Sequence, residues 1–147
     1  MNLREIEERV AAIEPSPGVE YLADLLLAYG LPRTSVSRLM SGTYDKAETA
    51  DERLWKDKVY FRYTEGPEES LYEHIDAARA DERVVTHRPR FLIVKNNVRL
   101  LASDQKTGAT LDIEVGELAS NATFFGAWAG FEKTQLENLN YVDRKAA

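Results

Sequence analysis

Acidic side chains gather on both sides of a short segment, residues 58–65, that is rich in aromatic and β-branched residues. These carboxylates are Asp51, Glu52, Asp57, Glu65, Glu68 and Glu69. Carboxylate oxygens are the ligands that Mg²⁺ prefers, and a metal-dependent nuclease places one acidic residue near one strand. On the next strand it places an acidic residue and a lysine two positions apart. Metal-dependent hydrolysis is therefore the first chemistry to test against this segment.

The segment does not supply the second half of such a site. If it is a strand, the alternate residues Arg62 and Thr64 point to the same face. An arginine cannot ligate a cation, and a threonine cannot replace the charge of a lysine. We therefore expect no catalytic residues and no metal site in the usual positions.

In an alternative, metal-dependent hydrolysis is retained because a carboxylate at another position replaces the missing ligand. Glu52, Glu65 or Glu69 would then hold Mg²⁺, and Lys56 or Lys58 would assist the attacking water. Only under this alternative does the chain itself require a metal cofactor.

Residues 83–90 form a locally basic stretch whose arginines could contact phosphates. Arg83, Arg88 and Arg90 are therefore the DNA-binding candidates, although a solvated loop between a helix and a strand explains them as well. His74 and His87 lie thirteen positions apart, 87 minus 74, with no third ligand at a metal-site spacing, so surface histidines explain both.

Composition predicts one soluble, cytoplasmic domain spanning residues 1–147. Hydrophobic residues make up 44% of the chain, enough for a core, and no apolar run approaches the length of a membrane helix. The absence of cysteine excludes disulfides and thiolate metal sites. The net charge of −6 disfavours, but does not exclude, DNA binding by this domain alone.

Hydrophobic periodicity predicts an α/β (α+β) fold. Helices are expected over residues 2–14, 19–29, 34–42 and 68–81, with Asn2 as an N-cap in the first. Strands are expected over residues 58–65, 91–94, 98–102 and 110–115, giving a central mixed sheet of about four strands with flanking helices. Residues 43–57 are expected to be a loop with room for one short strand, and residues 117–125 to be helical or irregular.

Several ordered segments together resemble a known family. They are residues 22–31, 89–94, 98–100, 104–108, the aromatic and small residues of 124–131, and 143–147. The chain is similar to the N-terminal domain of single-chain type IIG or IIL restriction–modification enzymes of the MmeI-like group. It also resembles that domain in related adenine-specific DNA methyltransferases.

The resemblance implies a PD-(D/E)xK nuclease-like fold, in which active members carry an aspartate before an E-x-K motif. Glu52 falls at the aspartate position, and Arg62 and Thr64 fall at the glutamate and lysine positions. The resemblance therefore implies a degenerate copy that does not cleave DNA.

It also implies a longer parent protein in a restriction or phage-defence system. The S-adenosylmethionine motif and the N-P-P-Y motif would lie beyond Ala147, so that S-adenosylmethionine is the parent's cofactor, with the methyltransferase domain in cis. DNA would be bound through the parent, with no membrane involved. The sequence leaves three functions open: an inactive accessory domain, a metal-dependent nuclease with a migrated carboxylate, or a pure protein-interaction domain.

Overall fold

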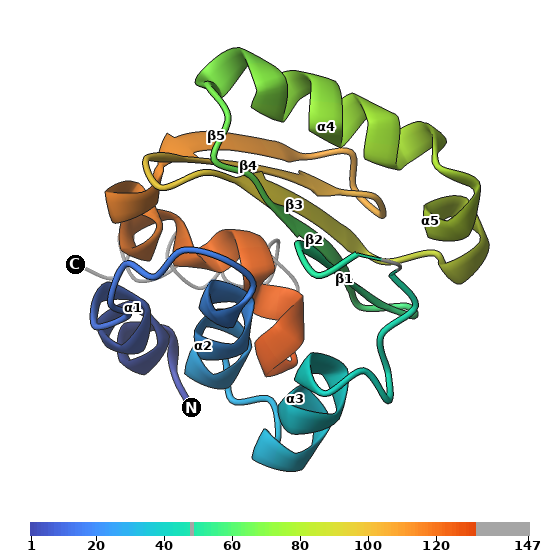
Figure 1. The fold of residues 1–147 in the computed structure, drawn as a ribbon. Helices are drawn as coiled ribbons and strands as arrows, with labels where there is room; N and C mark the ends of the chain where they lie inside the picture. The colour runs from blue at the N-terminus through green and yellow to red at the C-terminus, as the bar shows by residue number, and fades with distance from the viewer. Residues whose placement is uncertain (48, 132–147) are drawn as a thin grey trace.

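The computed structural model describes residues 1–47 and 49–131, and it confirms the predicted α+β fold (Figure 1). The strands are β1 (Glu52–Trp55), β2 (Val59–Tyr63), β3 (Phe91–Lys95), β4 (Arg99–Asp104) and β5 (Thr110–Glu114). The α-helices are α1 (Leu3–Ala11), α2 (Glu20–Ala28), α3 (Arg33–Met40), α4 (Glu68–Ala80) and α5 (Glu82–His87). Two 3₁₀ segments follow β5, namely η1 (Val115–Glu117) and η2 (Ala119–Ala129).

The strands form one mixed sheet in the order β1-β2-β3-β4-β5. Neighbouring strands are antiparallel except β2 and β3, which are parallel and are connected through α4 and α5. Because a parallel connection must cross over the sheet, it places this helix pair on one face. The helices α1, α2 and α3 and the segment η2 cover the other face (Figure 1).

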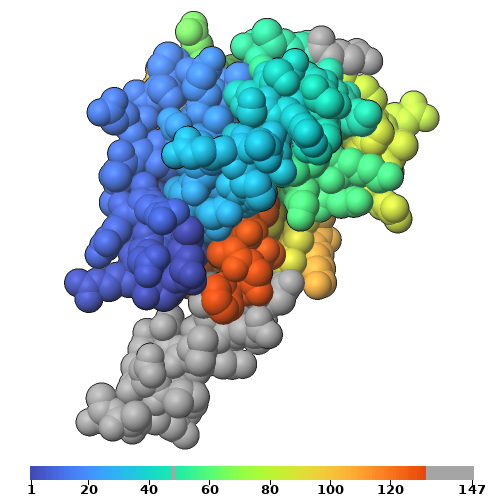
Figure 2. Space-filling view, turned by 90° about the horizontal axis from the view of Figure 1, so that it is seen from below, coloured from blue at the N-terminus to red at the C-terminus, as the bar shows by residue number. Residues whose placement is uncertain are grey.

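Alternation along the strands divides the core between the two faces. Phe61, Phe91 and Ile93 point to the face covered by α1–α3 and η2, and all are fully buried. Tyr60 and Leu92 point to the face covered by α4 and α5. Figure 2 shows the first face from outside, with η2 filling the space beside α1 and α2.

Local signals explain where the first helices begin and end. The Asn2 side chain accepts a hydrogen bond from the Glu5 amide at 2.9 Å and caps α1, as predicted. After α2 the chain turns at Gly30, whose φ of 88° would strain any residue with a Cβ. Pro32 then provides the extended residue before α3.

Two segments differ from the sequence-based expectation. The sheet has five strands rather than about four, because the short strand that residues 43–57 could hold forms as β1. Residues 83–90 were expected to be a loop, which is wrong for their first part, since α5 extends to His87. Asp81 caps α5 by accepting from the Arg83 amide, and Val84 is buried, so one cap and one apolar contact suffice for this short helix.

The resemblance drawn at residues 143–147 lies outside the described residues. Within residues 1–47 and 49–131, no helix is long and apolar enough to cross a membrane.

Candidate functional site

The β1–β2 hairpin brings the first candidate residues together. Its register places Glu52 directly opposite Arg62. Both side chains lie on the sheet face covered by α4, because they alternate with Phe61, which points to the other face. The Glu52 side chain is 5% exposed and that of Arg62 is 33% exposed, so the carboxylate is buried beneath a partly exposed guanidinium.

Both carboxylate oxygens of Glu52 have partners. Oε1 accepts a hydrogen bond from the Thr49 hydroxyl at 2.7 Å, and Oε2 accepts one from the Tyr60 hydroxyl at 2.5 Å. The Arg62 Nη1 atom lies 4.0 Å from the same Oε2, a distance at which the attraction is Coulombic rather than a hydrogen bond. Burial, reinforced by the hydrogen bond to Glu52, raises the pKa of the Tyr60 phenol, so Tyr60 remains a donor to the carboxylate.

His74 contributes an imidazole from α4. Burial, and then the positive charge of Arg62, lowers the pKa of His74 below its ordinary value. The His74 imidazole is therefore mainly neutral at neutral pH. The Arg62 Nε atom is buried without a hydrogen-bond partner among the described residues.

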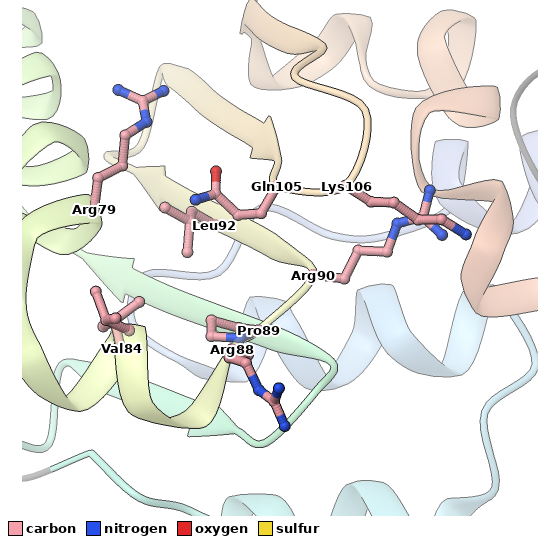
Figure 3. A pocket seen from close by; sticks show the side chains of 9 residues that line it. Arg79, Val84, Arg88, Pro89, Arg90, Leu92, Gln105 and Lys106 are labelled. Carbon is pink, nitrogen blue, oxygen red and sulfur yellow. The ribbon is translucent and has the colours of Figure 1, made fainter.

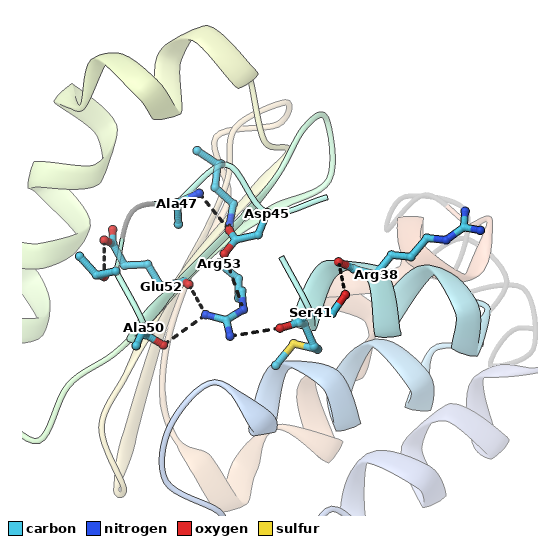
Figure 4. Close-up of polar contacts among 10 residues, drawn as sticks. Arg38, Ser41, Asp45, Ala47, Ala50, Glu52 and Arg53 are labelled. Carbon is cyan, nitrogen blue, oxygen red and sulfur yellow. Dashed lines mark hydrogen bonds and ion pairs between the residues drawn. The ribbon is translucent and has the colours of Figure 1, made fainter. Parts of the chain in front are cut away.

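The loop before β1 is tied down by a second polar network, drawn in Figure 4. Arg53 donates hydrogen bonds to the backbone carbonyls of Ala50, Glu52 and Met40. Asp45 accepts from the amides of Ala47 and Leu54, and lies 3.7 Å from the Arg53 Nε atom. These bonds fix the backbone on both sides of Glu52 and thereby fix the direction of its side chain.

The residues of this site do not fit a divalent cation. Mg²⁺ requires six oxygen ligands, whereas Glu52 is a single carboxylate already hydrogen-bonded at both oxygens. A guanidinium 4.0 Å from that carboxylate would repel the ion. Thr64 does not compensate, because its hydroxyl accepts from the Gly66 amide at 3.1 Å and closes the turn before α4.

Apart from Glu52 itself, the residues of the migrated-site alternative lie at the surface. Glu65 and Glu69 are exposed, as are Lys56 and Lys58. In residues 1–47 and 49–131, no three His, Cys, Asp or Glu side chains are grouped so that they could hold a metal ion.

The structure places the predicted DNA-binding arginines in two different environments. Arg83 forms an ion pair with Asp81 at 3.1 Å within its own helix turn. Arg88 and Arg90 line a cavity of about 490 Å³ near the start of β3, together with Arg79 and Lys106 (Figure 3). Sequence reasoning missed the latter two, because Arg79 belongs to the preceding helix α4 and Lys106 to the β4–β5 turn, both outside the basic stretch of residues 83–90.

Lys95, at the end of β3, was also missed. It is 2% exposed, and its Nζ atom lies 4.4 Å from the ring centroid of Tyr21 and 5.3 Å from that of Tyr63. Burial lowers the pKa of Lys95 to about 8. Its place directly after the apolar run of residues 91–94 carries no local signal of burial.

Comparison with known proteins identifies a family and a relative for this chain. The MmeI N-terminal domain family matches residues 1–147. "DNA methyltransferase A" of Bacillus subtilis (strain 168) is 32% identical over 148 residues, an alignment that covers all of this chain and 17% of that protein. No solved structure matches the chain significantly. The resemblance predicted from the sequence is thereby confirmed, and the chain belongs to the MmeI N-terminal domain family.

Proposed function

We propose that this domain is the accessory, nuclease-like module of an adenine-specific DNA methyltransferase in a type IIG restriction–modification or phage-defence system. In this proposal it has a PD-(D/E)xK-like sheet and does not cleave DNA. Membership of the MmeI N-terminal domain family and the printed name of the Bacillus relative support the methyltransferase context.

One observation carries the loss of cleavage. The guanidinium of Arg62 faces the Glu52 carboxylate, where a metal-dependent nuclease would need a second acidic ligand. The positive charge that a cation would supply is thus built into the protein as a side chain that cannot bind water or phosphate as a Lewis acid. In this proposal the guanidinium stabilises the Glu52 carboxylate but cannot support metal-dependent cleavage.

The proposal assigns methylation to the rest of a longer protein, with S-adenosylmethionine as its cofactor. The matched part is 17% of the Bacillus relative, which leaves most of that protein for other domains. In this arrangement the domain contributes its surface, its docking to the methyltransferase in cis, or both.

The direct test is a cleavage assay with the isolated chain. Supercoiled plasmid DNA incubated with the protein and either Mg²⁺ or Mn²⁺ is expected to remain uncut. Cleavage that disappears in the Glu52→Gln variant would overturn the proposal and favour the nuclease with a migrated carboxylate.

A gain-of-function variant makes the same test sharper. The double variant Arg62→Glu/Thr64→Lys restores the missing acid and lysine, and is expected to bind Mn²⁺ saturably in a calorimetric titration, whereas the natural chain does not. The matched control exchanges charge on an exposed residue, Arg33→Glu, and is expected not to bind the ion. Equal Mn²⁺ binding by the natural chain and the double variant would contradict the role assigned to Arg62.

A further inference from the structure

The cavity beside α5 is lined by basic side chains that come from separate parts of the chain. Arg79 lies near the end of α4, Arg88 and Arg90 lie between α5 and β3, and Lys106 lies in the β4–β5 turn. Its apolar floor includes Val84 and Leu92. Within residues 1–47 and 49–131, none of the residues lining it is acidic. In a chain of net charge −6, this local excess of positive charge stands out.

The positions of these cations are set by the fold. Arg88 adopts a left-handed conformation, with φ of 48°, and its amide donates to the Val84 carbonyl at 3.0 Å. The chain thus leaves α5 abruptly, with the exposed Arg88 side chain at the rim. Arg90 is anchored by two hydrogen bonds to Asp104, at 3.1 and 3.0 Å. Arg79 pairs with Asp76 on the surface of α4, a contact of the kind that contributes little free energy and exchanges readily.

The cationic groups are spread around the cavity rather than directed at one point. In Figure 3 the guanidinium of Arg79 lies on one side of the floor and that of Arg88 on another. The side chains of Arg90 and Lys106 both extend toward a third side in this view. A single phosphate ion would be held best by converging donors, whereas separated cations match successive phosphates of a polyanion.

We propose that this basic rim binds the phosphodiester backbone of double-stranded DNA. The rim includes two of the three arginines singled out in the sequence, Arg88 and Arg90, and excludes Arg83. These contacts would position DNA without reading its sequence. The inference rests on the proposed function, because the DNA in question is the substrate of the methyltransferase in cis.

The basic rim is separate from the Glu52–Arg62 pair. Residues before β3 lie beside the start of β2, since the Phe91 amide donates to the Lys58 carbonyl and the Asp57 amide to the His87 carbonyl. Arg62 stands near the other end of β2, opposite Val94. DNA binding at the rim therefore needs neither a metal nor the carboxylate, and the two sites can be tested independently.

The test measures binding of a labelled duplex to the full chain by fluorescence anisotropy over a series of salt concentrations. The variant Arg79→Gln/Arg88→Gln/Lys106→Gln removes three rim charges and spares the buried Arg90–Asp104 pair. Each lost phosphate contact is expected to weaken binding roughly tenfold at 0.1 M salt and to reduce the slope of log K against log salt by about one. The matched control, Arg9→Gln/Arg33→Gln/Lys46→Gln, removes three exposed charges elsewhere.

The outcomes separate the alternatives. Tight, salt-dependent binding that is lost in the rim variant and kept in the control supports the proposal, provided that thermal melting shows both variants folded. Equal binding by the natural chain and the rim variant overturns it, as does no binding at low salt. If inorganic phosphate protects the natural chain against melting but duplex DNA does not bind, the rim holds free anions and the DNA assignment is wrong. Metal-dependent cleavage by the natural chain would refute the proposed function while leaving the rim result intact.

Discussion

Arg62 and Lys95 are basic side chains on neighbouring strands, and they lie on opposite faces of the sheet. Arg62 lies under α4 and is balanced by the Glu52 carboxylate 4.0 Å away. Lys95 points toward α2 and contacts the rings of Tyr21 and Tyr63, with no carboxylate paired to it among the described residues. The first cation is stabilised by a charge and the second by aromatic faces alone.

Arg62 and Lys95 show two ways in which a protein accommodates a buried charge. A carboxylate partner makes removal of either charge costly, because the other is left buried and unpaired. An aromatic environment offsets only part of the desolvation, so the proton is held more weakly, as the pKa of about 8 for Lys95 records. The pair Arg90–Asp104 is a third case, in which the guanidinium forms two hydrogen bonds to the carboxylate.

The largest effect is expected at Asp104. This carboxylate is 2% exposed and accepts from Arg90 and from the Lys106 amide, so Asp104→Ala should destabilise the fold by about 3–4 kcal/mol in urea denaturation. Burial alone would raise the pKa of Asp104, but the hydrogen bonds from Arg90 and the Lys106 amide lower it overall. The contribution of the ionised Asp104 carboxylate to stability is therefore fully present above the unfolded-state pKa. It is lost as the pH falls through the lower folded-state pKa.

Two measurements check the Asp104 prediction. The exposed Asp76 serves as the control, and Asp76→Ala is expected to cost under about 0.5 kcal/mol. In urea denaturation between pH 7 and 3, the Asp104→Ala variant should lose less stability than the natural chain. Equal pH dependence in both would show that Arg90 does not hold this carboxylate ionised.

An intermediate loss is expected at Glu52. Glu52→Ala removes the acceptor for Tyr60 and Thr49 and the counter-charge of Arg62, so the cost should be about 2–3 kcal/mol. The effect is smaller than at Asp104 because Arg62 is one-third exposed and can turn toward water. The double variant Glu52→Ala/Arg62→Met should recover part of the loss. No recovery would mean that Arg62 is held by packing rather than by the carboxylate.

A change of opposite sign is expected at Lys95. Lys95→Met keeps the length of the side chain and removes the desolvated charge, so it should stabilise the fold by about 2 kcal/mol at pH 7. The folded-state pKa of about 8 lies below the unfolded value of 10.5, so the unfolded chain binds more protons between these pH values. The natural chain should therefore gain stability as the pH rises from 8 toward 10.5, with the full penalty present below pH 8.

The control for Lys95 is the pH profile itself. Subtracting the Lys95→Met curve from the natural one removes the titration of the tyrosines, which both proteins share. A difference that does not change between pH 7 and 10 would show that the lysine is solvated in the folded protein.

The smallest effect is expected at Arg99, at the start of β4, next to the edge strand β5. Arg99 contacts Glu68 at 3.1 Å and Asp112 at 2.8 Å, and both acids are about half exposed. Arg99→Gln should cost no more than about 0.5 kcal/mol, and less at 1 M salt, because exposed ion pairs are screened. A loss of stability as large as that of Glu52→Ala would contradict the expectation that exposed ion pairs contribute less stability than buried ones.

The sequence predicted those features that depend on local signals. The Asn2 cap and the strands expected over residues 91–94 and 98–102 formed where their patterns indicated. The family resemblance assigned Glu52 and Arg62 to motif positions, and their pairing across the β1–β2 hairpin is a finding of the structure that the sequence did not predict.

The features that escaped prediction depend on contacts between distant segments. The basic rim joins Arg79, Arg88 and Lys106 from three elements, and no spacing in the chain brings them together. Lys95 lies against the rings of Tyr21, seventy-four positions earlier (95 minus 21), and Tyr63, thirty-two positions earlier (95 minus 63). Helix α5 depends on one cap and one buried valine, too little for a periodic signal to detect.

The parallel pairing of β2 with β3 has a consequence for the order of assembly. The β1–β2 hairpin and the β3–β4–β5 meander are each built from strands adjacent in the chain, whereas their junction closes a loop that contains both α4 and α5. Local pairings form quickly, and closing the longer loop is slower because more chain entropy is lost. We expect the two sheet halves to acquire amide-exchange protection first, and the amides across β2 and β3 to become protected last during refolding.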